Sequence, residues 1–267
     1  MRDLVDEINS KQIKILGAYG TKAKGFGTSS IYLNMQNIID AGNLLNGLGD
    51  KCAEIENIYL THSHLDHICD IAYVIDHYFS ARKKSLNIIG LPQTIEDIKK
   101  HFLNDIIWPD FSKIALDNSG EMAIVYKELA LGREYKINDE ESIKAFKTDH
   151  TVASCGYIYR SDESSIMITA DTYSLENAIS ELENDLSITT LIVECSFPSS
   201  MEKLAQESKH LTSKTLFREL NKLDRDDIEI YINHMKPAFI KEIKYEIEQY
   251  RGNRDVKLLK DEEIINF

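Results

Sequence analysis

A dense group of potential metal ligands occupies residues 62–67 of the chain, directly after the apolar run 58–60. His62, His64, Asp66 and His67 fall within these six positions, which packing alone does not explain. In an extended segment alternate side chains point the same way, so His62 and His64 face one site together. Neutral imidazole suits zinc, iron or manganese, and a carboxylate adds charge and hardness. This segment therefore predicts a metal centre.

The residues after this segment indicate that the side chains of Asp66 and His67 point in a different direction from those of His62 and His64. Apolar residues recur with helical spacing at positions 68, 71, 72 and 75. If the chain turns into a helix at this point, Asp66 and His67 point away from His62 and His64. They are then placed to serve a second ion.

Four strand-like segments end at residues that can bind a metal. His62, Asp171, Glu194 and His234 each come immediately, or one residue, after an apolar strand pattern. The carboxyl ends of strands open onto a common edge where ligands converge. A lone strand-end Asp is more often a cap or a turn residue. Four such ends, together with the histidine segment and His150, favour a metal site.

The elements that must position these residues form a layered α/β pattern. Strands are expected at 13–16, 31–33, 38–39, 86–90, 156–159, 166–170, 191–193 and 228–232, with short strands between 122 and 147 around an acidic turn at 138–142. Helices are expected at 66–80, 92–102, 174–184, 212–222 and 238–248, and 104–114 is expected to be an irregular cap. Asp40 ends a predicted hairpin. Asp40 could either support the metal ligands from behind or simply form a turn, and the sequence leaves both roles open.

Composition describes one ordinary globular domain over residues 1–267. Hydrophobic residues make up 43% and charged residues 28% of the chain. No apolar run approaches the length that crosses a membrane, and residues 1–10 are too acidic and polar for a signal peptide. We therefore expect a cytoplasmic protein without a membrane partner. The four cysteines have no paired spacing, so reduced and mostly buried thiols are expected.

The formal net charge of −13 argues against a surface that tracks the phosphates of a long nucleic acid. A small anionic substrate is compatible with this charge, because two bound divalent cations would reverse the local field. Whether subunits associate, for example as a homodimer, is left open by the sequence.

The ligand pattern resembles the metallo-β-lactamase superfamily, whose hallmark is an HxHxDH loop followed by a distant His, a distant Asp and a final His. The resemblance covers nearly the whole chain. The residues that match the hallmark are His62, His64, Asp66, His67, His150, Asp171 and His234. The resemblance implies an α/β fold of the four-layer αββα sandwich type and two divalent ions. By that resemblance His62, His64 and His150 hold one ion. Asp66, His67 and His234 hold the other, and the carboxylate of Asp171 bridges them.

Within the superfamily the chain resembles the class II cyclic-nucleotide phosphodiesterases. The motifs that carry the resemblance stand in the expected order: Leu65 in the histidine loop, His101 with Asn104, residues 107–111 (IWPDF), Gly156-Tyr157, residues 194–198 (ECSFP), residues 208–212 (SKHLT) and residues 234–237 (HMKP). One departure is that Asp70 and Ile75-Asp76 stand where that family usually has a Gly or Ser and then Ser-Ala or Ser-Pro.

The resemblance implies hydrolysis of a 3′,5′-cyclic nucleotide, a small anionic substrate, to the 5′-monophosphate. Water between two ions has its pKa lowered toward about 7, so a bridging hydroxide attacks phosphorus. Zinc is the expected ion, and manganese or iron also suits the ligands. Asp66, His210 and Glu194 are the predicted catalytic residues. His210 donates a proton to the leaving group and Glu194 orients its ring, although by position alone His210 is equally a surface residue.

Three other functions remain open. An RNA 3′-processing nuclease is one, against which the acidic balance and Leu65, in place of the usual glycine, both count. A lactonase or thioesterase is another, because the fold does not fix the chemistry. The third is a sensor that binds a nucleotide at the ions without turnover. His77 is interpreted as structural, His101 and Trp108 as part of a pocket rim, and the role of Lys236 is left undecided.

Overall fold

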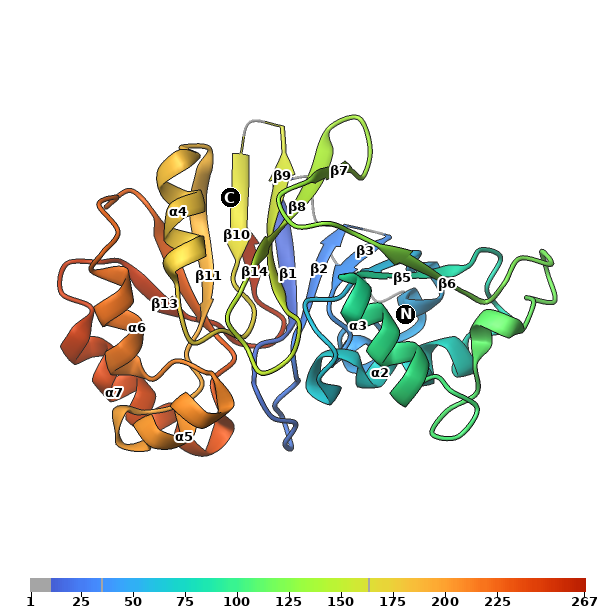
Figure 1. The fold of residues 1–267 in the computed structure, drawn as a ribbon, viewed down its shortest axis with the longest axis horizontal. Coiled ribbons are helices and arrows are strands. Elements are labelled where there is room, and N and C mark those ends of the chain that lie inside the picture. Colours follow the sequence, from blue (N-terminus) through green and yellow to red (C-terminus); the bar gives the residue numbers. More distant parts are fainter. Residues whose placement is uncertain (1–10, 35, 163) are drawn as a thin grey trace, which may run out of the picture.

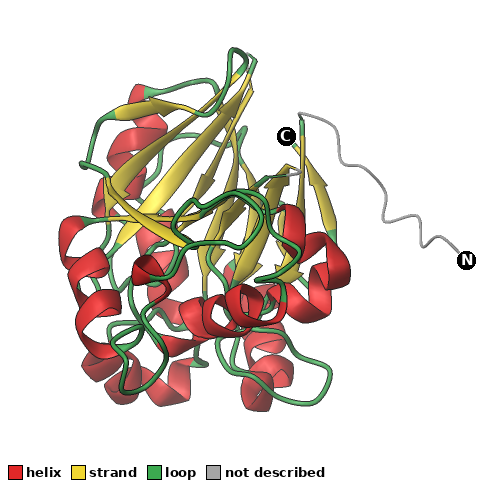
Figure 2. Ribbon diagram, turned by 90° about the vertical axis from the view of Figure 1, so that its right-hand side faces the viewer, coloured by secondary structure: helices red, strands yellow, loops and turns green. Residues whose placement is uncertain are grey.

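The computed structural model describes residues 11–34, 36–162 and 164–267 (Figure 1). Residues 1–10, on which the signal-peptide expectation rested, and Met35 in the predicted hairpin turn lie outside the described residues. In the described part of the chain, 14 strands form two sheets of seven strands each. Helices flank both sheets, as Figures 1 and 2 show, so the predicted αββα sandwich is confirmed.

The first sheet has the strand order β14-β1-β2-β3-β4-β5-β6. Strands β3 to β6 run parallel to one another, and β14, β1, β2 and β3 pair antiparallel. The strand bounds are β1 Gln12–Gly17, β2 Ser30–Asn34, β3 Asn37–Ile39, β4 Asn57–Tyr59, β5 Leu86–Gly90, β6 Ile124–Glu128 and β14 Ile264–Asn266.

The second sheet has the strand order β13-β12-β11-β10-β9-β8-β7. Strands β10 to β13 are parallel, and β7 to β10 are antiparallel. The strand bounds are β7 Glu134–Lys136, β8 Glu141–Lys147, β9 Cys155–Ser161, β10 Ser164–Ile168, β11 Ile188–Glu194, β12 Glu229–Asn233 and β13 Val256–Leu258.

Three helices belong to the half of the chain that contains the first sheet, and four to the half that contains the second. Figure 1 shows α2 and α3 on one outer side of the molecule and α4, α6 and α7 on the other. Their bounds are α1 Leu44–Leu48, α2 Leu65–His77, α3 Pro92–His101, α4 Glu176–Asn184, α5 Glu202–Ser208, α6 Ser213–Leu220 and α7 Ile240–Tyr250. None of the helices in residues 11–34, 36–162 and 164–267 is both long and apolar enough to cross a membrane.

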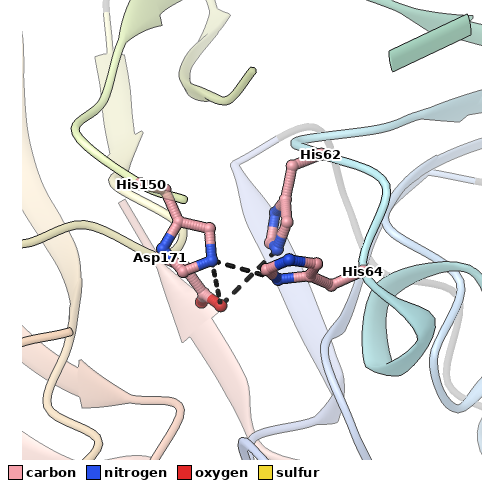
Figure 3. Close-up of side chains that lie close together, drawn as sticks. All are labelled: His62, His64, His150 and Asp171. Carbon is pink, nitrogen blue, oxygen red and sulfur yellow. Dashed lines mark hydrogen bonds and ion pairs between the residues drawn. The ribbon is translucent and has the colours of Figure 1, made fainter. Parts of the chain in front are cut away.

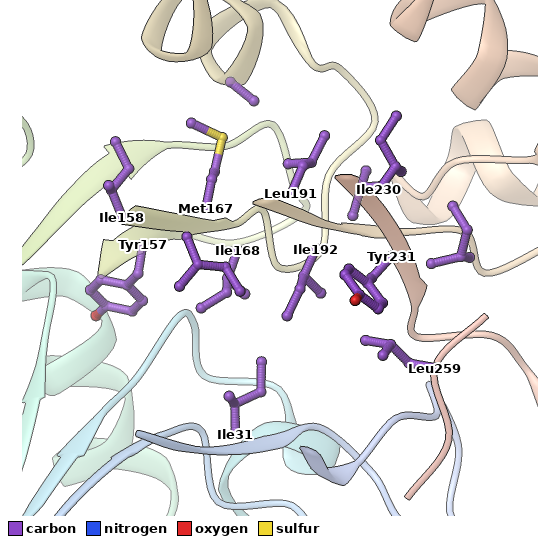
Figure 4. Close-up of a cluster of buried hydrophobic side chains, with 14 of the residues drawn as sticks. Ile31, Tyr157, Ile158, Met167, Ile168, Leu191, Ile192, Ile230, Tyr231 and Leu259 are labelled. Carbon is purple, nitrogen blue, oxygen red and sulfur yellow. The ribbon is translucent and has the colours of Figure 1, made fainter. Parts of the chain in front are cut away.

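The core follows from strand alternation, because successive side chains of a strand point to opposite faces of its sheet. In Figure 4 Tyr157, Ile168 and Ile192 point toward Ile31 of the opposite sheet. Met167 and its neighbours on the other face point toward the outer helices. All of these side chains are almost completely buried. Both faces of the second sheet are therefore apolar, as expected for a sheet that is covered by helices on one face and by another sheet on the other.

Several predicted boundaries were wrong by a few residues. The helix predicted at 66–80 ends at His77. Just beyond this end, the buried guanidinium of Arg82 donates hydrogen bonds to the carbonyls of Cys52 and Ile55. The acidic turn predicted at 138–142 is shorter, because Glu141 is already part of β8. Its buried carboxylate accepts a hydrogen bond from Asn34 Nδ2 at 2.7 Å.

The four cysteines are unpaired, as predicted, and Cys52, Cys155 and Cys195 are buried. Burial raises the pKa of the Cys52 thiol to about 12, so it stays protonated at neutral pH. Residues 104–114 form an irregular segment with one short 3-10 turn, Phe111–Lys113. In this segment Trp108 packs edge-on against Tyr73 of α2, with the ring centroids 5.5 Å apart.

Candidate metal centre

The histidine segment changes from extended chain to helix between His64 and Leu65. His64 has extended backbone and occupies the N-cap position of α2, so Asp66 lies in the first helical turn. His62 and His64 thereby join His150 and Asp171, and the potential ligand atoms of these four residues lie within 4.8 Å of one another (Figure 3). His150 Nε2 is 3.1 Å from His64 Nδ1 and 3.8 Å from Asp171 Oδ2.

A second group forms from the helical side of the segment. Asp66 and His67 meet His234, and their potential ligand atoms also lie within 4.8 Å of one another. His234 Nε2 is 3.4 Å from Asp66 Oδ2 and 3.2 Å from His67 Nε2. The structure thus brings together all seven residues predicted as ligands, in the two groups that were predicted.

Asp171 lies between the two groups. Its Oδ2 is 3.6 Å from His62 Nε2 and 3.4 Å from His67 Nε2. Its Oδ1 is 3.2 Å from His234 Nε2. One carboxylate therefore faces ligands of both groups, as a bridging ligand must.

Tight turns at three strand ends aim these side chains. Asp40 follows β3 with a φ of 58°, Ala170 precedes Asp171 with a φ of 55°, and His234 follows β12 with a φ of 61°. Left-handed backbone is unfavourable for residues other than glycine and is concentrated at functional sites. The chain therefore accepts local strain at three of the turns that build the site.

Hydrogen bonds from Asp40 and Thr61 orient the first imidazoles. Asp40 Oδ2 is 2.7 Å from His67 Nδ1, and the Thr61 hydroxyl donates to the same oxygen at 2.8 Å. Thr61 Oγ1 is also 3.0 Å from His62 Nδ1. If each Nδ1 donates its proton, Nε2 of His62 and His67 is left with a free lone pair facing the site. Of the two roles left open for Asp40, support for the ligands is the one that its contacts show.

A corresponding network holds the residues from the second sheet. His210 Nδ1 is 2.8 Å from Glu194 Oε1, and the Ser196 hydroxyl donates to Glu194 Oε2 at 2.9 Å. Ser196 Oγ is 3.0 Å from His234 Nδ1. His210 follows the C-terminal end of α5, where its backbone N–H donates to Ala205 O at 2.8 Å. His210 and Glu194 therefore form the pair predicted from the sequence, beside the ligands.

Burial and the neighbouring carboxylates set the charge preferences of the histidines. Burial lowers the pKa of His62 well below its usual value and that of His150 to about 4, so both rings are neutral at pH 7. Burial also opposes a charge on His67, but Asp171 and Asp40 outweigh it and raise its pKa. The position around His67 therefore favours a positive charge, which a divalent cation would supply.

The residues fit a metal by their type, and also because some of their buried polar atoms have no hydrogen-bond partner. His62 Nε2 and Asp171 Oδ1 are two of the seven buried side-chain atoms in the described residues that have no hydrogen-bond partner. An unsatisfied buried polar atom is costly and rare in folded proteins. Imidazole nitrogens and carboxylate oxygens that converge in this way suit zinc, iron or manganese.

Comparison with known families gives a match over most of the chain. The model of the family described as cAMP phosphodiesterases class-II matches residues 24–260. The chain belongs to this family.

Two curated relatives match this class-II phosphodiesterase family member over about half of their own length. The 3′,5′-cyclic-nucleotide phosphodiesterase 1 of Saccharomyces cerevisiae is 29% identical over 194 residues, which cover 64% of this chain and 51% of the relative. Ribonuclease Z of Picrophilus torridus is 29% identical over 165 residues, which cover 58% of this chain and 49% of the relative. The chain thus spans about half the length of these curated relatives.

Solved structures establish the fold of this class-II family member. Unliganded yeast PDE1 is similar with a TM-score of 0.78 and 21% identity, over 96% of this chain and 99% of that chain. The metallo-β-lactamase fold protein YhfI from Bacillus subtilis gives a TM-score of 0.72 and 18% identity, over 96% and 99% of the two chains. The metallo-β-lactamase fold expected from the sequence is therefore confirmed.

Other residues singled out in the sequence take different places. His101 lines a hollow next to the centre, as expected for a residue of a pocket rim. Trp108 is not one of the described residues that line this hollow, and its ring packs against Tyr73 of α2 instead. Lys236 Nζ donates to Gly20 O at 2.6 Å and so holds the loop between β1 and β2. His77 is exposed at the last turn of α2, and its ring contacts Tyr78.

Sequence reasoning missed the two hydroxyls of Thr61 and Ser196. Both are next to or near predicted ligands in the chain, but a serine or threonine at such a position is too common to be a signal. Asp70, where the chain departs from the family pattern, is buried, and its Oδ2 accepts a hydrogen bond from Leu45 N at 3.0 Å. This departure therefore ties α2 to the start of α1.

Proposed function

We propose that this chain is a metal-dependent phosphodiesterase that opens 3′,5′-cyclic nucleotides to 5′-monophosphates. The observation that carries the proposal is the convergence of two ligand groups around Asp171, with the His210 and Glu194 pair beside them. Family membership and the cyclic-nucleotide phosphodiesterase relative support the substrate class.

Seven side chains would hold two divalent ions. His62, His64 and His150 would bind one ion through the nitrogens that face the first group. Asp66, His67 and His234 would bind the other, and Asp171 would be shared. When bound, such ions polarise phosphoryl oxygens and lower the pKa of water toward about 7. We propose zinc, and the ligand set also accepts manganese or iron.

His210 would supply the proton that the leaving group needs. Burial opposes its charge, but the contact with Glu194 outweighs burial and raises the pKa of His210, so the imidazolium is favoured. Glu194 holds Nδ1–H, which leaves Nε2–H directed into the site, 4.0 Å from Asp171 Oδ2. Water adds its oxygen to phosphorus and gives up one proton, the bond from phosphorus to the 3′ oxygen breaks, and the Nε2 proton of His210 passes to that oxygen. The proton given up by water then restores the imidazolium of His210.

An RNA 3′-processing nuclease is the second candidate. Ribonuclease Z of Picrophilus torridus is a relative, and the short form of human tRNase Z has the same fold with a TM-score of 0.67 and 17% identity. The net charge of −13 counts against a long RNA substrate. The cyclic nucleotide therefore remains the preferred proposal.

Product analysis separates these activities. Purified protein loaded with zinc is incubated with cAMP, cGMP, a tRNA precursor and a panel of lactones, and the products are resolved by chromatography. We expect 5′-monophosphates from the cyclic nucleotides, and none from the matched variant Asp171→Asn. Cleavage of the RNA alone would make the protein a nuclease. Tight nucleotide binding without turnover would make it a sensor.

A further inference from the structure

A hollow of about 530 Å³ opens beside the candidate metal centre. Ser63 and Leu65, which alternate with His64 along the chain, form part of its wall. Val152, two residues after His150, forms another part. A ligand in the hollow would therefore lie directly beside a phosphate held at the first ligand group.

The walls of the hollow are largely apolar. Ile98, Phe102 and Ile107 line it together with Leu65. Leu65 is 65% exposed and Ile107 is 62% exposed, so large apolar side chains border this opening without cover from the rest of the described chain. The volume lies in the range of pockets for small ligands, roughly 300 to 1,000 Å³. A flat aromatic ring would cover these side chains and stack against Phe102.

One carboxylate gives the hollow a polar preference. Among the described residues that line it, Asp97 is the only one with a carboxylate. Its Oδ2 accepts a hydrogen bond from Ser63 Oγ at 3.1 Å, and its Oδ1 accepts one from Gln93 Nε2 at 3.0 Å. An ionised carboxylate has about four acceptor positions, so each oxygen retains room for another donor. The hollow therefore favours a ring with adjacent N–H donors on one edge.

We propose that this hollow binds the base of the cyclic nucleotide and that Asp97 selects guanine. Guanine presents N1–H and the 2-amino group side by side, which two carboxylate oxygens can accept together. Adenine presents one amino group next to the acceptor N1, and that acceptor would face the negative carboxylate. The inference rests on the proposed function for the identity of the ligand as a cyclic nucleotide.

Binding of the reaction products tests the selection without turnover. The affinities of GMP and AMP for the zinc-loaded protein are measured by isothermal titration calorimetry. We expect GMP to bind at least about 10-fold more tightly than AMP, as hydrogen bonds to a charged group imply. Asp97→Asn should abolish this preference by weakening GMP binding. Glu96→Gln is the matched control, because Glu96 is the neighbouring exposed carboxylate of α3 and does not line the hollow, and it should keep the preference.

Hydrolysis of bis(p-nitrophenyl) phosphate, a diester without a base, tests the chemistry separately. We expect the wild type to hydrolyse it, and Glu96→Gln to do so at a rate within about twofold of the wild type. Hydrolysis of this diester together with equal affinities for GMP and AMP would overturn the guanine assignment and leave the proposed function standing. Equal weakening of GMP and AMP by Asp97→Asn would also overturn it. A GMP preference that depends on Asp97, with no hydrolysis of bis(p-nitrophenyl) phosphate or of a cyclic nucleotide, would support guanine binding in the hollow. It would refute the proposed hydrolase activity.

Discussion

At the scale of single residues, the centre uses the same arrangement twice. Asp40 and Thr61 lie behind ligands of the first half, and Glu194 and Ser196 lie behind His234 and His210 of the second. In each case a buried carboxylate and a hydroxyl lie within hydrogen-bond distance of the Nδ1 atoms of two imidazoles. Such support fixes the tautomer and the ring orientation, and it raises the basicity of a ligand nitrogen.

Replacing His210 separates proton donation from metal binding. In His210→Ala we expect both ions to remain, because His210 belongs to neither predicted ligand group, while kcat for the cyclic nucleotide falls about 100- to 10,000-fold. Metal content by plasma emission and initial rates provide the measurements. The matched control is His77→Ala, which removes an exposed histidine from α2. A normal rate in His210→Ala would exclude His210 as the proton donor.

Replacing Ser196 tests the network behind His234. Ser196→Ala removes the oxygen that lies 3.0 Å from His234 Nδ1 and 2.9 Å from Glu194 Oε2. We expect metal affinity or kcat/KM to fall about 10- to 100-fold, as with other residues that support metal ligands. Competition with a chromophoric chelator gives the affinity. If both quantities match those of the wild type, the hydroxyl is a packing feature only.

At the scale of elements, the sequence predicted those that carry the ligands best. Strong apolar runs ending in His, Asp or Glu identify β4, β10, β11 and β12 without knowledge of their partners. β14 was missed because it has three residues and pairs with β1 from the opposite end of the chain. Periodicity carries no information about such distant pairing. That His64 presents Nδ1 while His62 presents Nε2 also depends on how α2 begins, which only the structure shows.

A ladder of asparagines links four neighbouring strands of the first sheet. Asn37 Nδ2 donates to Asn34 at 2.6 Å, Asn57 Nδ2 to Asn37 at 2.9 Å, and Asn87 Nδ2 to Asn57 at 2.9 Å. Asn57→Ala removes two of these bonds and leaves Asn37 Oδ1 without its donor. We expect a loss of about 1–3 kcal/mol in the free energy of unfolding, measured with urea.

The matched control for the ladder is Asn184→Ala. Its amide donates to Ser180 O within α4 at 2.7 Å and is exposed, so we expect a much smaller loss. Neither variant should change kcat/KM, because the ladder does not touch the ligands. Equal stabilities of the two variants would mean that the ladder contributes nothing beyond a surface hydrogen bond.

At the scale of the whole molecule, the candidate centre joins the two halves of the sandwich. His62 and His64 lie between β4 and α2 of the first half, and Asp66 and His67 lie at the start of α2 itself. His150, Asp171 and His234 come from the second half. The first half cannot complete either ligand group by itself. Metal binding and the packing of the two sheets must therefore be thermodynamically linked.

This linkage predicts a large effect of metal removal on thermal stability. A ligand that binds only the folded chain stabilises it by about 4 kcal/mol when its concentration is a thousandfold above Kd. For a chain of this size that corresponds to a Tm shift on the order of 10 °C. Scanning calorimetry of the zinc-loaded protein before and after dialysis against a chelator gives the shift. In Asp171→Asn, which lacks the ionised carboxylate that lies between the two groups, the shift should nearly vanish, whereas His77→Ala should retain it. An unchanged Tm after complete removal of the metal would show that the two halves pack independently of the ions, and the centre would then have no part in holding the sheets together.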